Sequence, residues 1–188
     1  MASKNLSGLD WFKKNQSKYP DSDSLADLSG SFKSNVTNFI KALQDAGAKV
    51  SIDSTLRDPT RAFIMHWAWK VGKGMVKADK VPSKSGVDIE WDHDDDKESQ
   101  KAAQDMIGKS GFNMAYIAAL DSNHLTGQAI DMDISWSATL KIKNAKGEDV
   151  EIATSPTNGN NKELQAVGET YGVKKLASDP PHWSYNGR

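Results

Sequence analysis

The sequence predicts an α+β protein with a mostly antiparallel sheet flanked by helices. Apolar residues recur at helical spacing in residues 32–43, which indicates an amphipathic helix. Apolar and polar residues alternate in 49–55 and again in 128–135, which indicates two half-buried strands. Helical and strand segments mix along the chain without the regular strand–helix–strand alternation of a parallel sheet, so the α+β class follows.

The first half of the chain holds two helices and a strand between them. The helix at 32–43 is followed by the strand at 49–55. Asp58 before Pro59 is typical of a helix start, because the aspartate side chain accepts hydrogen bonds from free N–H groups and proline already has the required φ angle. The segment 60–71 is apolar nearly all round, so we expect a buried helix there.

The second half of the chain mixes short helices and short strands. Helices are predicted where apolar spacing and capping residues agree, and strands where alternation is bounded by turn residues. The predicted elements are a helix at 96–109, a strand at 128–135, a hairpin of 139–142 with 148–153, a helix at 161–171 and a strand at 173–176.

Composition excludes several classes of protein. The 24 Lys and Arg residues are balanced by 25 Asp and Glu, so no basic excess favours nucleic acid or an acidic membrane surface. Cysteine is absent, which excludes disulfides, thiolate zinc sites and cysteine nucleophiles. Residues 1–14 lack the apolar core of a signal peptide, and no apolar run is long enough to span a membrane. We therefore expect a soluble protein of one domain, covering residues 1–188.

Two short segments carry the residues best suited to chemistry. Residues 122–131 read Ser-Asn-His-Leu-Thr-Gly-Gln-Ala-Ile-Asp, which places His124 in a turn and Asp131 in a strand. Residues 179–182 read Asp-Pro-Pro-His, and the two prolines stiffen the approach to His182. Two histidines and one carboxylate are a typical ligand set of a catalytic zinc ion, which keeps its fourth position for water.

These segments resemble the zinc D-Ala-D-Ala carboxypeptidase/dipeptidase family, which includes phage-type L-alanyl-D-glutamate endopeptidases and has the hedgehog/DD-peptidase fold. Ser-x-His-x-x-Gly-x-Ala-x-Asp, followed by an acidic residue three before His-Trp, carries the resemblance. Ser54-Thr-Leu-Arg57 is similar to the family's Ser-Gly-Tyr-Arg element. The matching elements run from about residue 51 to residue 183, which leaves 1–30 as an N-terminal extension and 83–110 as an insertion.

The resemblance implies a role for each matching residue. His124, Asp131 and His182 would be the zinc ligands. Asp179 would stand where the family keeps its general base, which is more often a longer glutamate. Arg57 would bind substrate and steady the oxyanion, and Ser122 would be a hydrogen-bonding residue of the substrate site.

The resemblance also implies a function. The protein would be a zinc peptidase of bacterial peptidoglycan stem peptides, with L-Ala–D-Glu endopeptidase favoured over D-Ala-D-Ala carboxypeptidase. It would act as a monomer in the periplasm or on the cell wall, after release or secretion from the cytoplasm without a Sec signal. Two rivals stay open: a zinc-containing cell-wall binding module without catalysis, and a non-haem iron oxygenase with a two-histidine, one-carboxylate site.

Alternatives also stay open for single residues. Asp133 lies on the same strand face as Asp131 and competes with it as a ligand. Asp179 could cap a turn instead of acting as a base, and Arg57 could pair with a neighbouring Asp58 or Asp53.

The two other histidines have structural explanations. His66 lies between apolar residues, which favours a hydrogen-bonded core position. His93 lies in the acidic run 92–96, which could hold Ca²⁺ but more simply forms a solvated turn before the next helix.

Overall fold

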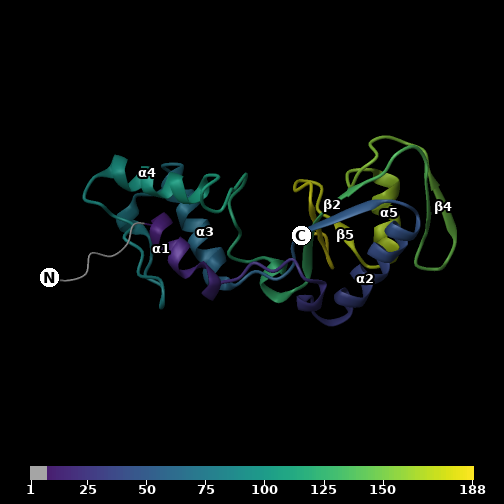
Figure 1. Ribbon diagram of the computed structural model, residues 1–188, viewed down its shortest axis with the longest axis horizontal. Helices are drawn as coiled ribbons and strands as arrows, with labels where there is room; N and C mark the ends of the chain where they lie inside the picture. The colour runs from purple at the N-terminus through teal and green to yellow at the C-terminus, as the bar shows by residue number, and fades with distance from the viewer. Residues whose placement is uncertain (1–7) are drawn as a thin grey trace. The chain divides into compact units, whose positions relative to one another are not determined.

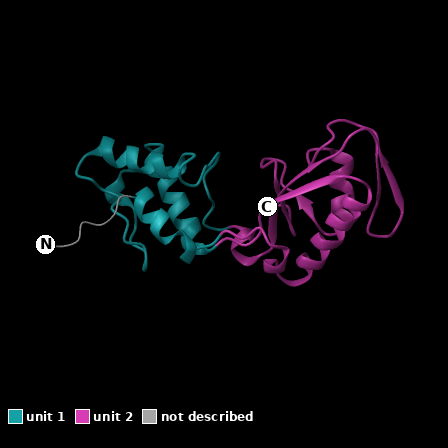
Figure 2. Ribbon diagram, in the orientation of Figure 1, with its two compact units in different colours: residues 1–20, 58–121 teal, residues 21–57, 122–188 magenta. Residues whose placement is uncertain are grey.

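The computed structural model describes residues 8–188, which divide into two compact units (Figure 2). Of the described residues, unit 1 holds 8–20 and 58–121, and unit 2 holds 21–57 and 122–188. The chain, expected to form one domain, thus contains two compact units, and each buries an apolar core of its own. The signal-peptide prediction falls partly on residues 1–7, which lie outside the described residues.

Unit 2 is built on a four-stranded sheet in the order β1-β2-β6-β5, in which every neighbouring pair is antiparallel. The α+β class with an antiparallel sheet is therefore confirmed. The strands are β1 (Lys49–Ser54), β2 (Ala129–Ser135), β5 (Lys174–Lys175) and β6 (His182–Ser184), with a separate hairpin of β3 (Leu140–Lys143) and β4 (Asp149–Ile152). The helices are α2 (Gly30–Asp45) and α5 (Lys162–Thr170), with single 3-10 turns η2 (Leu25–Asp27) and η4 (Asn123–Thr126).

Both helices of unit 2 pack on the same core as the apolar face of the sheet (Figure 1). Trp183 of β6 is fully buried there, and its ring lies 5.6 Å from that of Phe39 in α2. Ile130 and Met132 of β2 enter the same core. Because alternate strand residues point to opposite faces, the burial of these side chains turns Asp131 and His182 toward the other face.

Unit 1 is helical. Its helices are α1 (Gly8–Asn15), α3 (Pro59–Gly72) and α4 (Asp96–Ile107), with single turns η1 (Gln16–Lys18) and η3 (Ala78–Lys80). The helices share a core in which Phe12, Ile64 and Met106 are buried. The expected insertion 83–110 thus supplies α4 to this core.

Most predicted elements are confirmed to within a few residues. Asp58 caps α3 by accepting hydrogen bonds from the amides of Thr60 and Arg61, and Pro59 is the first helical residue. The strand expected at 173–176 is reduced to Lys174–Lys175, and β6 was not foreseen. Helix α1 was also missed, since eight residues give too short a pattern to identify.

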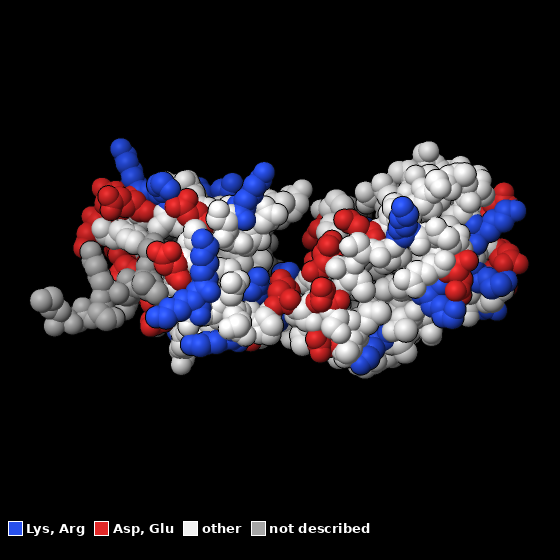
Figure 3. Space-filling model, in the orientation of Figure 1, with Lys and Arg blue, Asp and Glu red and all other residues white. Residues whose placement is uncertain are grey.

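Charged side chains of both signs are interspersed on the face shown in Figure 3, in line with the near-zero net charge. Among the described residues, no helix has both the length and the apolar character needed to cross a membrane.

Gly127 offers a test of how η4 joins the rest of unit 2. Its φ is +66°, and a Cβ atom there would lie 2.7 Å from the main-chain oxygen of Asp27. We expect Gly127→Ala to lower the free energy of unfolding by roughly 2–4 kcal/mol, from backbone strain plus the clash. Gly147→Ala is the matched control, because Gly147 has φ +84° but open space around it, and about 1 kcal/mol is expected there. Urea denaturation measures the free energy of unfolding of both variants. Equal losses in Gly127→Ala and Gly147→Ala would contradict the close approach of Gly127 to the main-chain oxygen of Asp27.

Candidate metal centre

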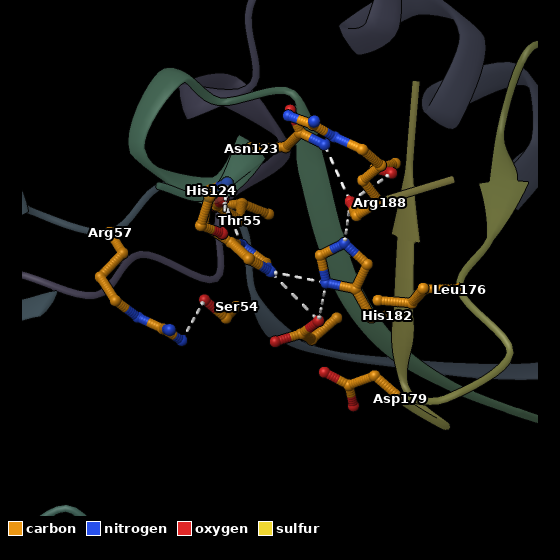
Figure 4. A network of polar contacts seen from close by, with 12 residues as sticks. Ser54, Thr55, Arg57, Asn123, His124, Leu176, Asp179, His182 and Arg188 are labelled. Carbon is orange, nitrogen blue, oxygen red and sulfur yellow. Dashed lines mark hydrogen bonds and ion pairs between the residues drawn. The ribbon is translucent and has the colours of Figure 1, made fainter. Parts of the chain in front are cut away.

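Three side chains from separate parts of unit 2 meet at one point (Figure 4). His124 Nε2 lies 3.1 Å from Asp131 Oδ1 and 3.1 Å from His182 Nδ1. His182 Nδ1 lies 3.0 Å from Asp131 Oδ1. The three potential ligand atoms thus form a nearly equilateral triangle, and the group could hold a metal ion.

The sheet register brings Asp131 and His182 together. Asp131 of β2 is paired directly with His182 of β6 on one side and with Ser54 of β1 on the other. The β1–β2 register shifts between Ile52 and Ser54, which leaves Asp53 as an extra residue in β1. Ser54, Asp131 and His182 therefore form a row across three strands.

The turn before β2 delivers His124. The Ser122 side chain caps η4 by accepting a hydrogen bond from the His124 amide at 3.3 Å. Gly127 ends the turn in the left-handed conformation, so that the chain reverses into β2. Ser122, expected in the substrate site, thus caps the turn that carries His124.

Hydrogen bonds to main-chain oxygens determine which histidine nitrogens face the site. His124 Nδ1 lies 2.9 Å from the carbonyl oxygen of Thr55, and His182 Nε2 lies 3.0 Å from the main-chain oxygen of Arg188 (Figure 4). These oxygens only accept, so both ring nitrogens carry the proton and donate. In the neutral rings the opposite nitrogens are therefore unprotonated, and their lone pairs point at each other and at the Asp131 carboxylate.

Three converging lone pairs repel one another unless a cation lies among them. Donor atoms about 2.0–2.1 Å from a zinc-sized ion lie about 2.9 Å apart at right angles and about 3.4 Å apart at the tetrahedral angle. The observed separations of 3.0–3.1 Å fall between these limits. Main-chain acceptors behind both rings are the usual outer partners of metal-bound histidines. The residues present thus fit a transition-metal ion.

Asp131 is held in its ionised form. Burial raises its pKa, whereas His124 and His182, when also protonated at the nitrogens that face it, donate hydrogen bonds and positive charge that lower the pKa well below the usual range. The pKa of the exposed Asp53 is raised, first by partial burial and then by the charges of Asp133 and Asp131.

Arg57 is anchored by a residue that the sequence did not single out. Its Nε donates to Asp21 Oδ2 at 3.0 Å, and a terminal guanidinium nitrogen donates to Ser54 Oγ at 3.3 Å. Ser54 Oγ in turn donates to Asp21 Oδ1 at 2.7 Å. Asp21 lies in the expected N-terminal extension, within a polar loop whose sequence gives no signal for this contact. Part of that extension is thus integral to unit 2.

The remaining candidates lie outside the triangle. Asp133 is exposed two residues further along β2, opposite Ser51, so alternation alone was insufficient to separate it from Asp131. Asp179 is half-buried, and Figure 4 shows it and Arg57 approaching the histidine pair from opposite sides. Asp58 is used as a helix cap.

The two other histidines lie in unit 1. His66 Nδ1 lies 2.8 Å from the main-chain oxygen of Ala118, and its ring meets Trp67 edge-on. It is hydrogen-bonded as expected, although half-buried rather than fully in the core. His93 is half-buried, and Asp95 in the same acidic run caps α4. The prediction that the acidic run 92–96 forms a turn before a helix is therefore confirmed for Asp95.

Comparisons with known proteins assign the chain to no family. No family model matches the sequence, and no curated protein matches it. Function therefore has to be argued from the chemistry of the site itself.

Asp131 and Asp133 form a matched pair for testing the metal centre. We expect Asp131→Asn to weaken binding of Zn²⁺ or Co²⁺ by about 100-fold or more, because it removes both a ligand and the only negative charge of the triangle. Asp133→Asn removes the same charge two residues away and is expected to change the affinity less than threefold. Competition with a chromophoric chelator measures both. Equal effects would show that the strand face as a whole, and not the triangle, attracts the metal.

Proposed function

We propose that the protein is a zinc-dependent peptidase of bacterial peptidoglycan stem peptides. The observation that carries the proposal is the triangle of His124, Asp131 and His182, in which every facing atom is a lone-pair donor. The resemblance of the flanking motifs to the zinc D-Ala-D-Ala carboxypeptidase/dipeptidase family supports the substrate class. By the same resemblance we propose that unit 2 has the hedgehog/DD-peptidase fold.

Zinc is the metal best suited to these ligands. Two imidazoles and a carboxylate leave a position for water, and zinc bound in this way is a Lewis acid that supplies hydroxide near neutral pH. His124 and His182 would bind through the nitrogens that face Asp131. Thr55 and Arg188 would keep both rings in the correct tautomer through their main-chain oxygens.

Asp179 and Arg57 would complete the site. The Asp179 carboxylate would take the proton released when water attacks the peptide carbonyl and pass it to the leaving amine. Arg57, whose guanidinium is fixed by Asp21 and Ser54, would bind a carboxylate of the stem peptide or the negative charge that develops on the carbonyl oxygen. Anchoring on one edge leaves the guanidinium oriented before substrate arrives, which lowers the entropic cost of binding.

Within this class we favour cleavage between L-Ala and D-Glu over removal of a terminal D-Ala, with action in the periplasm or on the cell wall. The competing function is a cell-wall binding module that has kept the metal and lost catalysis. The shorter Asp179, in place of the family's usual glutamate, is the observation that favours this second function.

Mass spectrometry of digested muropeptides tests the proposal directly. We expect one equivalent of zinc per chain and the appearance of a new D-Glu amino terminus. New tripeptide or tetrapeptide ends that have lost D-Ala would instead indicate carboxypeptidase activity. Intact muropeptides together with binding to sacculi would favour the module without catalysis, and a chain that takes up no zinc would contradict both functions.

Asp179 gives a second test, through substitutions that leave the metal ligands in place. We expect Asp179→Asn to lower kcat by about 10²–10⁴-fold, because the amide accepts no proton, while zinc affinity changes little. Asp179→Glu should keep part of the activity, and Ser178→Ala, at the exposed neighbouring position, should keep all of it. Stopped assays on a defined stem peptide, with zinc titrations alongside, separate the two effects. An unchanged kcat in Asp179→Asn would remove Asp179 from the mechanism.

A further inference from the structure

The loop between β5 and β6 carries Asp179 and leads into His182, and its backbone closes into a ring. The Leu176 amide donates to the His182 oxygen at 3.1 Å, the Asp179 amide donates to the Leu176 oxygen at 3.2 Å, and the His182 amide donates to the Asp179 oxygen at 3.1 Å. Each of the three residues thus donates to one of the others and accepts from the third.

The three carbonyl oxygens of this ring converge on one cation. Lys175 Nζ donates to the Leu176 oxygen at 2.6 Å, to the His182 oxygen at 3.0 Å and to the Asp179 oxygen. An ammonium group has three N–H donors, and here each has its own acceptor. The same nitrogen lies 5.7 Å from the centre of the buried Trp183 ring, which adds a cation–π contact.

The geometry of this cradle of three carbonyl oxygens suits an ammonium group. The pKa of Lys175 is lowered overall, chiefly by burial and also by the charge of Lys162, although the nearby carboxylates Asp179 and Asp131 raise it. A neutral amine has only two N–H groups and would leave one of the three oxygens without a donor. Three carbonyl dipoles directed at one point stabilise a compact positive charge, as do the carbonyl rings that bind monovalent cations in channel filters.

We propose that Lys175 is a positioning residue of the metal centre. Its ammonium group fills a cradle formed by the main-chain oxygens of Leu176, Asp179 and His182, and so fixes the loop that aims His182 at the metal and Asp179 at the substrate. The coupling to metal and to Asp179 rests on the proposed function, whereas the cradle itself rests only on the loop geometry. When the lysine side chain is removed, the cradle should accept a small free ammonium ion.

Substitution at Lys175, with its strand neighbour as control, tests the proposal. Lys175→Met keeps most of the aliphatic stem and removes the charge. We expect zinc affinity to fall by about 10–100-fold, as for other outer partners of metal ligands. Hydrogen exchange at the amides of residues 176, 179 and 182 should accelerate, while exchange in β1 stays unchanged. Lys174→Met, at the exposed neighbouring position, should alter neither.

Chemical rescue separates a specific cradle from a general packing role. Methylammonium added to Lys175→Ala should restore amide protection and zinc affinity in a saturable manner. Tetramethylammonium, which has no N–H donor, should not restore them. Lys175→Arg keeps the charge but presents a planar group, so its amide protection and zinc affinity should lie between those of Lys175→Ala and the unchanged chain.

The outcomes are separable. Unchanged hydrogen exchange at the amides of residues 176, 179 and 182 in Lys175→Met would show that Lys175 does not hold the loop. No response to methylammonium in Lys175→Ala would show the same. Lost protection with unchanged zinc affinity would overturn the positioning role. A wild-type chain that takes up no zinc would overturn the proposed function and the coupling to metal, while the exchange and rescue measurements would still decide the cradle.

Discussion

The mutual repulsion of three lone pairs is the constraint on which unit 2 depends. Hydrogen bonds behind His124 and His182 keep a proton on each outer nitrogen, so in the neutral rings the inner nitrogens turn lone pairs toward Asp131. A buried arrangement of this kind is costly unless a cation neutralises it. The two main-chain acceptors therefore do more than hold the rings, because they leave the inner nitrogens as the positions at which each neutral ring can bind a cation.

Two further anchors extend this preorganisation outward. Asp21 and Ser54 hold Arg57 on one side of the site, and Lys175 gathers the loop that carries Asp179 on the other. Arg57 is held by hydrogen bonds along one edge of its guanidinium group, and Lys175 by hydrogen bonds from all three of its N–H groups, so each side chain needs little reordering when a ligand binds. The groups that would bind substrate and move protons thus depend on a second layer of polar contacts.

The sheet converts local patterns into this geometry. Burial of Ile130 and Trp183 in one core sends Asp131 and His182 to the opposite face, and the antiparallel register sets them directly across from each other. A shift of β6 by one residue would turn His182 toward the apolar core and Trp183 toward the face that carries Asp131. The apolar core is therefore what defines the position of the polar site.

The sequence by itself determined most local elements and singled out the three residues of the cluster, because helix spacing, strand alternation, caps and the short motifs at 122–131 and 179–182 are all local signals. It did not determine the division into two units, strand β6 or the partner of Arg57, and alternation left Asp133 as a rival to Asp131. Each of these depends on contacts between segments far apart in the chain, such as Asp21 with Arg57 or Lys175 with the oxygen of His182. Every residue carries a main-chain oxygen, so the residue type does not show which oxygens accept hydrogen bonds from the site histidines. Only the tertiary structure decided that the oxygen of Thr55 is one of them.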